Sequence, residues 1–199
     1  MAAPPNTPIP TWLAARFTAG DRRPQYDIVC TLLLWRFPIE RRFMVNPPAS
    51  IGLYFPMDVD GSDSELPRSI NASNHEVIPI ETSPGNRGPV NFPDFIVTKV
   101  GGTLNELEDR IVLVVEVKPS HAGVPAATTQ LGNYLTLIQD KAAVDGRPLS
   151  STLFGMVIVG DQAILARLTT GGKPEDMGIH SITGPIVYRF LSDIAVANW

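Results

Sequence analysis

Ionisable residues stand at the end of one apolar segment, where the packing of a hydrophobic core does not explain them. The segment Arg110–Lys118 is mostly apolar and β-branched, which predicts a strand buried on both faces. It nevertheless ends in Glu116 and Lys118. Side chains alternate across a strand, so these two residues share one face while Val117 points to the other. An acid and an amine on one face at the end of a buried strand are candidates for chemistry.

A second predicted strand supplies another carboxylate. The segment Phe92–Thr98 is largely apolar, and its Pro93 stands near the start, where a missing N–H is tolerated. If this strand pairs with the later one, Asp94 comes beside Glu116. Hard divalent cations prefer carboxylate, carbonyl and water oxygens. Two carboxylates and a lysine at one edge of a sheet therefore predict a binding site for a divalent metal ion.

These residues resemble the motif of a known nuclease superfamily. Pro93-Asp94 is followed, after a gap of about twenty residues, by Glu116-Val117-Lys118 at the end of a hydrophobic strand. This pattern is similar to that of the PD-(D/E)XK nucleases, which share the restriction-endonuclease-like fold. Gln130 and Tyr134 follow on a predicted helix, and the segment 154–165 resembles the hairpin found after this helix in many members. The resemblance covers about residues 76–168, roughly half of the chain.

The resemblance implies a fold and an activity. The fold would be α/β, with a mixed central β-sheet flanked by helices as in the restriction-endonuclease-like sandwich. The activity would be metal-dependent hydrolysis of phosphodiester bonds in DNA, with RNA as the second candidate substrate and Mg²⁺ or Mn²⁺ as cofactor. Asp94, Glu116 and the backbone carbonyl of Val117 would bind the metal ion. Lys118 would orient the attacking water or stabilise the developing charge, and Gln130 would contact a metal-bound water or the scissile phosphate.

Several alternatives remain open from the residues alone. Many members of the superfamily carry one more acid before the sheet, and Asp27 is the preferred candidate over Glu40 because it lies within an apolar predicted helix. The favoured interpretation of Asp27 is nevertheless an exposed carboxylate at a helix start. Gln130 could be an ordinary polar position on a helix, and Tyr134 is more often a core residue. The three motif residues could also form a surface carboxylate and a strand-end ion pair.

The net charge of the chain is relevant to whether its binding partner is a nucleic acid. A net charge of −4 argues against a dedicated nucleic-acid binder, because such binding depends on neutralising phosphates. Arg22, Arg23, Arg41 and Arg42 are nonetheless candidates for nucleic-acid contacts, or they form an ordinary solvated face. The rival interpretation of the whole chain is a catalytically inactive nuclease-fold module that acts as a nucleic-acid- or protein-binding scaffold. A homodimer is possible, since two active sites cut a duplex more easily.

Length and composition suit one domain. A chain of 199 residues is long enough for a single core. Residues 1–10 carry four prolines and predict a flexible lead, residues 11–199 a single domain, and residues 46–74 a loop insertion. The single Cys30 suits a reducing compartment, and the N-terminal residues lack the pattern of a secretory signal. These features predict a protein inside the cell, cytoplasmic or nuclear, that is not bound to a membrane.

The remaining elements follow from periodicity and turn residues. Helices are expected wherever apolar residues recur at helical spacing, and strands wherever β-branched runs lie between turn signals. Helices are predicted over residues 12–17, 24–37, 126–144 and 185–196. Strands are predicted over residues 42–45 and 75–80, a hairpin over residues 152–167, and a loop over residues 169–183.

Overall fold

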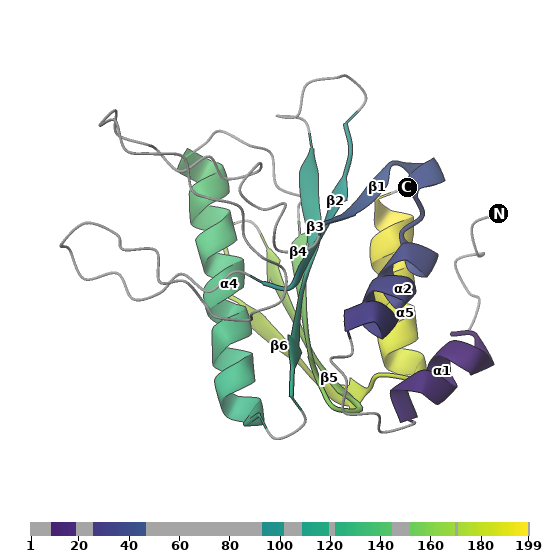
Figure 1. Cartoon of the computed structure of the whole chain (residues 1–199). Coiled ribbons are helices and arrows are strands. Elements are labelled where there is room, and N and C mark those ends of the chain that lie inside the picture. Colours follow the sequence, from purple (N-terminus) through teal and green to yellow (C-terminus); the bar gives the residue numbers. More distant parts are fainter. Residues whose placement is uncertain are drawn as a thin grey trace, which may run out of the picture.

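The computed structural model describes residues 9–18, 26–46, 93–101, 109–119, 122–144, 152–169 and 171–198. Its strands form one six-stranded mixed sheet in the order β1-β2-β3-β4-β5-β6 (Figure 1). The strands are β1 (Phe43–Asn46), β2 (Phe95–Lys99), β3 (Arg110–Lys118), β4 (Thr152–Val159), β5 (Gln162–Thr169) and β6 (Glu175–Ser181). The helices are α1 (Thr11–Thr18), α2 (Tyr26–Arg36), the 3-10 turn η1 (Ile39–Arg41), α4 (Val124–Val144) and α5 (Pro185–Ala197). The predicted α/β class, with a mixed central sheet flanked by helices, is therefore confirmed.

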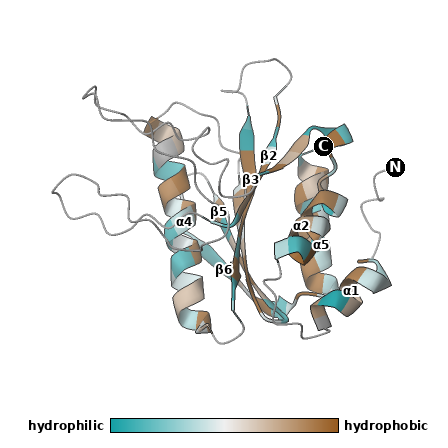
Figure 2. Ribbon diagram, in the orientation of Figure 1, coloured by the Kyte–Doolittle hydropathy of each residue, from teal (hydrophilic) through white to brown (hydrophobic). Residues whose placement is uncertain are grey.

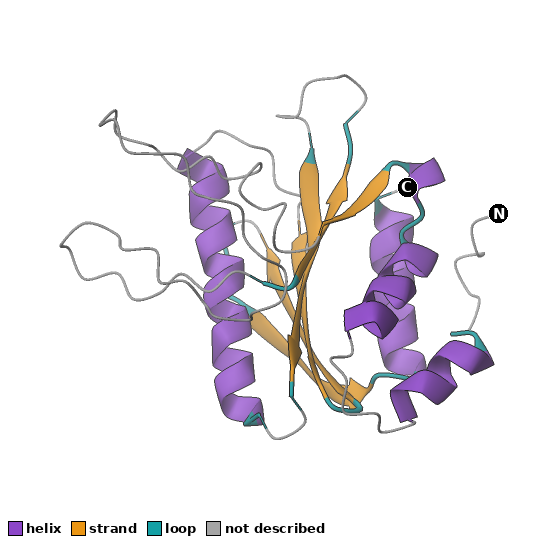
Figure 3. Cartoon of the chain, viewed as in Figure 1, coloured by secondary structure: helices purple, strands orange, loops and turns teal. Residues whose placement is uncertain are grey.

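Helices cover both faces of the sheet (Figure 3). Helix α4 lies on one face, and α1, α2 and α5 lie on the other. Most of the central strands are hydrophobic in Figure 2, as expected for a sheet buried on both sides. Two apolar clusters fill the spaces between the layers. The larger joins the sheet to α1, α2 and α5, and the smaller joins it to α4.

Strand β3 is central to both clusters. Leu113, Val115 and Val117 belong to the cluster under α1, α2 and α5, whereas Val114 belongs to the one under α4. The two-residue period then puts Glu116 on the α4 face. Strand β3 is antiparallel to β2 and parallel to β4. A parallel pair requires a crossover connection, and α4 lies within it.

A glycine lets α4 approach the sheet closely. A Cβ atom added to Gly155 of β4 would lie 2.6 Å from Cδ1 of Leu131 and 3.3 Å from Cδ1 of Leu135. Only a residue without a side chain leaves room for these two leucines. This close packing sets how near α4 lies to the sheet at Gly155.

The sequence predicted most of these elements and missed one strand. The predicted bounds of β3 agree with the structure, and the helices over α4 and α5 and the hairpin β4–β5 are also confirmed. The loop predicted over residues 169–183 is wrong, because it contains β6. The residues of β6, Glu175–Ser181, lack an apolar β-branched run and are exposed or half-buried throughout. They form a strand because β5 offers an edge to pair with.

Three predictions lie outside the described residues. These are most of the proline-rich lead, the insertion after Asn46, and the strand over residues 75–80. Among the helices that the structure describes, none combines the length and apolar character needed to cross a membrane.

Candidate active site

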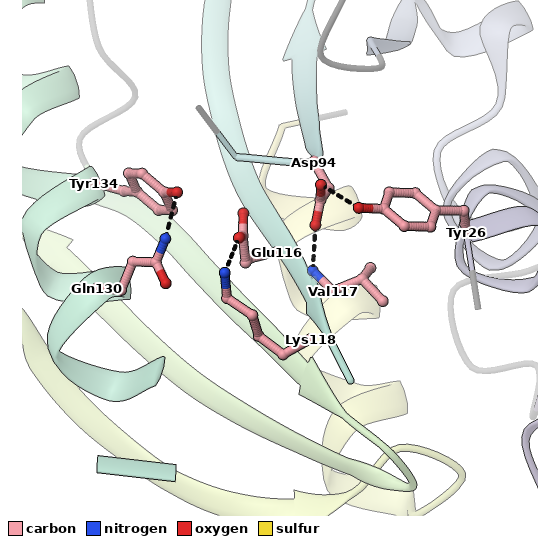
Figure 4. A network of polar contacts seen from close by, with 7 residues as sticks. All are labelled: Tyr26, Asp94, Glu116, Val117, Lys118, Gln130 and Tyr134. Atoms are coloured by element: carbon pink, nitrogen blue, oxygen red, sulfur yellow. Dashed lines mark hydrogen bonds and ion pairs between the residues drawn. The ribbon is translucent and has the colours of Figure 1, made fainter. Parts of the chain in front are cut away.

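The register of β2 and β3 brings Asp94 to the end of β3. Phe95 pairs with Val115 in this antiparallel ladder, so Asp94 comes opposite Glu116. Asp94 lies just before β2, where the backbone pairing ends. Its Oδ2 accepts a hydrogen bond from the Val117 backbone N–H at 2.6 Å, so the side chain extends the ladder by one bond (Figure 4). The predicted convergence of these strands is confirmed.

Helix α2 contributes a residue that the sequence did not single out. The hydroxyl of Tyr26 donates to Oδ1 of Asp94 at 2.6 Å, across 68 positions of the chain. The Tyr26 ring also lies against Phe95, with a centroid separation of 5.9 Å. Burial raises the pKa of the Tyr26 phenol, and the hydrogen bond to Asp94 and the charge of Glu116 raise it further. Tyr26 therefore stays protonated at neutral pH and keeps its hydrogen to donate.

Glu116 is a carboxyl group buried within the α4 face of the sheet. It is 5% exposed, and its Oε1 lies 2.5 Å from Nζ of Lys118. Its Oε2 is buried and accepts no hydrogen bond from the residues that the structure describes. Burial raises the pKa of Glu116 to about 7, with a further contribution from the charge of Asp94, while Lys118 acts in the opposite direction. The surroundings of Glu116 therefore stabilise the ionised form of its carboxyl group only in part.

Gln130 and Tyr134 face this carboxyl group from α4 (Figure 4). Residues four apart share one face of a helix, and the Gln130 Nε2 donates to the Tyr134 hydroxyl at 2.7 Å. Tyr134 is buried, which raises the pKa of its phenol, and the charges of Glu116 and Asp94 raise it further. Both residues thus border the site, although neither donates a hydrogen bond to Asp94 or Glu116 among the described contacts.

The other predicted site residues lie elsewhere. Asp27 is exposed on α2, and its charge contributes to the raised pKa of Cys30. Arg41 and Arg42 lie beside Lys99, at the opposite end of β2 from Asp94. Arg22 and Arg23 are outside the described residues.

The donor atoms can be tested against the needs of a divalent cation. Within the described ranges, no group of three or more His, Cys, Asp and Glu side chains is arranged to hold a metal ion. Mg²⁺, however, is usually bound by only one or two carboxylates and keeps several of its waters. No donor among the described residues forms a hydrogen bond to the buried Oε2 of Glu116, and a cation would give this oxygen a partner. Two carboxylates and the Val117 carbonyl therefore fit a site of this sparse kind.

Sequence reasoning missed Tyr26 for a physical reason. Locally it is one more aromatic residue at the start of an apolar helix, and its polar contact forms with a residue far along the chain. The pairing of Gln130 with Tyr134, in contrast, was visible as a spacing of four. Comparison with protein-family models, with curated proteins and with solved structures found no match for this chain.

Proposed function

We propose that this chain is a metal-dependent nuclease that hydrolyses phosphodiester bonds of DNA, with a restriction-endonuclease-like fold. The observation that carries the proposal is the buried Glu116 carboxyl group, whose Oε2 accepts no hydrogen bond within the described part of the chain, beside Asp94 and Lys118. Burying a carboxylate in this way costs free energy unless it is paired and hydrogen-bonded. Such a cost is typical of a site that awaits a ligand.

The arrangement of elements supports the same proposal. Asp94 precedes one strand, Glu116 and Lys118 end its antiparallel neighbour, and α4 then leads to the hairpin β4–β5. This order agrees with the core of the superfamily whose motif the sequence resembles. Gln130, on α4, lies on the same side of the sheet as Glu116.

Each residue has a defined role in this proposal. Asp94, Glu116 and the Val117 carbonyl would hold Mg²⁺ or Mn²⁺. Bound there, the ion would stabilise negative charge on the phosphoryl and leaving oxygens and lower the pKa of a bound water.

Lys118 and Gln130 would act on the water and the phosphate. Lys118 would orient the attacking water through its ammonium group or donate to a phosphoryl oxygen. Gln130 would hold a water or phosphate oxygen with the amide hydrogen that it does not give to Tyr134. The attacking water would release one proton to solvent as its oxygen bonds to phosphorus, the bond from phosphorus to the leaving oxygen would break, and the leaving oxygen would take up a proton from solvent, so that one water is consumed.

A cleavage assay tests the proposal. Purified protein is incubated with plasmid, single-stranded DNA and RNA, each with Mg²⁺, with Mn²⁺ and with chelator. We expect cleavage of DNA that needs the metal and that falls about 100-fold or more in Lys118→Ala. Lys99→Ala is the matched control, because Lys99 lies at the far end of β2. Cleavage unchanged in Lys118→Ala would sink the proposal.

The rival function is an inactive scaffold of the same fold. One observation favours it: both oxygens of Asp94 already accept hydrogen bonds within the chain, at 2.6 Å each. Each carboxylate oxygen has a second lone pair, however, so these bonds do not block a cation. Binding of DNA without cleavage under every metal condition would favour the scaffold.

A further inference from the structure

Asp94 is held by two donors from separate parts of the fold. One oxygen accepts from the Val117 backbone in β3, and the other accepts from the Tyr26 hydroxyl in α2. A carboxylate with a single hydrogen bond can rotate about its side-chain bonds. Two bonds at 2.6 Å, one on each oxygen and each from a different element, restrict this rotation (Figure 4).

The tyrosine itself is firmly anchored. Helix α2 buries Val29, Leu32 and Leu33 completely in the larger apolar cluster. The Tyr26 ring packs against Phe95, the residue that follows Asp94. The hydroxyl therefore has a fixed place relative to β2, set by packing that does not depend on Asp94.

We propose that Tyr26 is the positioning residue for the Asp94 carboxylate, holding it in the orientation that binds the divalent cation. This inference rests on the proposed function, because it assigns Tyr26 to the same metal site. Its hydroxyl does not touch the cation or the nucleic acid. It acts by fixing the orientation of the carboxylate that would bind the cation. Partners of this kind orient metal ligands, and their loss typically costs about 10- to 100-fold in metal affinity.

The substitution Tyr26→Phe tests the role with little disturbance. It removes one oxygen and keeps the ring that packs against Phe95. Tyr188→Phe is the matched control, because Tyr188 is a half-buried tyrosine on α5 beside Arg36. Circular dichroism and thermal unfolding of all three proteins establish that each variant is folded.

Calorimetric titration of the metal-free full chain with Mn²⁺, without nucleic acid, is the primary measurement. We expect Tyr26→Phe to weaken Mn²⁺ binding about tenfold or more, and Tyr188→Phe to leave it unchanged. Cleavage by Tyr26→Phe should return to within about threefold of the wild-type rate at saturating Mn²⁺, because the ligand itself is intact. A merely structural role would predict a low rate that excess Mn²⁺ does not restore.

The possible failures are distinguishable. If the wild type binds Mn²⁺ and Tyr26→Phe binds it equally well, the positioning role is overturned while the proposed function stands. A rate that remains low at saturating Mn²⁺ also overturns it. If the wild type itself takes up no Mn²⁺, the proposed metal site fails and the role of Tyr26 fails with it.

Discussion

The ladder formed by β2 and β3 has ionisable side chains at both ends, and their surroundings differ between the two ends. At one end, Lys99 lies opposite Arg110 in register, and its pKa is lowered by burial and by the neighbouring charges of Arg42 and Arg41. At the other end, burial raises the pKa of Glu116. Both charges are therefore disfavoured by their surroundings.

The difference lies in what compensates each charge. The ammonium group of Lys99 donates to the Arg41 carbonyl at 2.6 Å and lies 4.6 Å from the centre of the Phe43 ring. These local contacts therefore compensate the charge of Lys99. Glu116 has Lys118 on one oxygen, and its other oxygen accepts no hydrogen bond from any described residue. An unusual pKa alone does not mark a functional site, whereas a buried polar atom without a donor calls for an explanation.

The substitution with the largest expected effect removes the charge of Glu116. Glu116→Gln keeps the shape of the side chain but offers the cation a neutral ligand. We expect Mn²⁺ binding by calorimetry and metal-dependent cleavage both to fall at least about 100-fold. Glu175→Gln serves as control, because Glu175 is an exposed acid paired with Arg167. Equal losses in both variants would contradict a special role for the buried acid.

The next effect is the pH dependence of metal binding. Below pH 7 the metal-free protein holds Glu116 mainly protonated, since its pKa is raised to about 7. A cation must then displace that proton. The apparent Mn²⁺ affinity should rise about tenfold for each pH unit up to about pH 7 and level off above it. Calorimetry in buffers of different ionisation enthalpy also counts the released proton. A flat profile over this range would speak against Glu116 as a ligand.

A smaller effect concerns stability without metal. The folded pKa of Glu116, about 7, lies above the ordinary value of 4.5, so the folded state binds the proton more tightly than the unfolded state. The stabilisation is full below pH 4.5 and is lost as pH rises through 7. Relative to wild type, Glu116→Gln should therefore gain about 3 kcal/mol in unfolding free energy between about pH 4 and pH 8. Urea unfolding with chelator measures this difference, and its absence would mean that the carboxylate is well satisfied.

The smallest effect is expected at the opposite end of the ladder. Lys99→Met removes the charge and keeps the length of the side chain. Because local contacts account for Lys99, we expect unfolding free energy to change by less than about 1 kcal/mol and Mn²⁺ affinity by less than about threefold. Parallel urea and calorimetric titrations check both values. A large loss of Mn²⁺ affinity in Lys99→Met would contradict the proposed difference between the two ends of the ladder.

The sequence predicted those parts of the site that depend on regular local structure. The period of two along β3 put Glu116 and Lys118 on one face, and the period of a helix put Gln130 and Tyr134 together. The apolar run of β3 is long enough for its bounds to be predicted. These features need only neighbouring residues to be recognised.

Features that depend on distant contacts were not predictable. The contact of Tyr26 with Asp94 exists because α2 packs against β2 in the folded state. The strand β6 exists because β5 has a free edge, not because Glu175–Ser181 has strand composition. The burial that raises the pKa of Glu116 likewise exists only in the folded chain.

The most direct test is anomalous X-ray diffraction from crystals of the full chain soaked in Mn²⁺. The central claim is that the end of the β2–β3 ladder binds a divalent cation through Asp94 and Glu116. We predict a manganese peak within about 2.0–2.6 Å of an oxygen from each of these carboxylates. Crystals that take up no manganese between them, or that hold it only at other residues, would contradict the account.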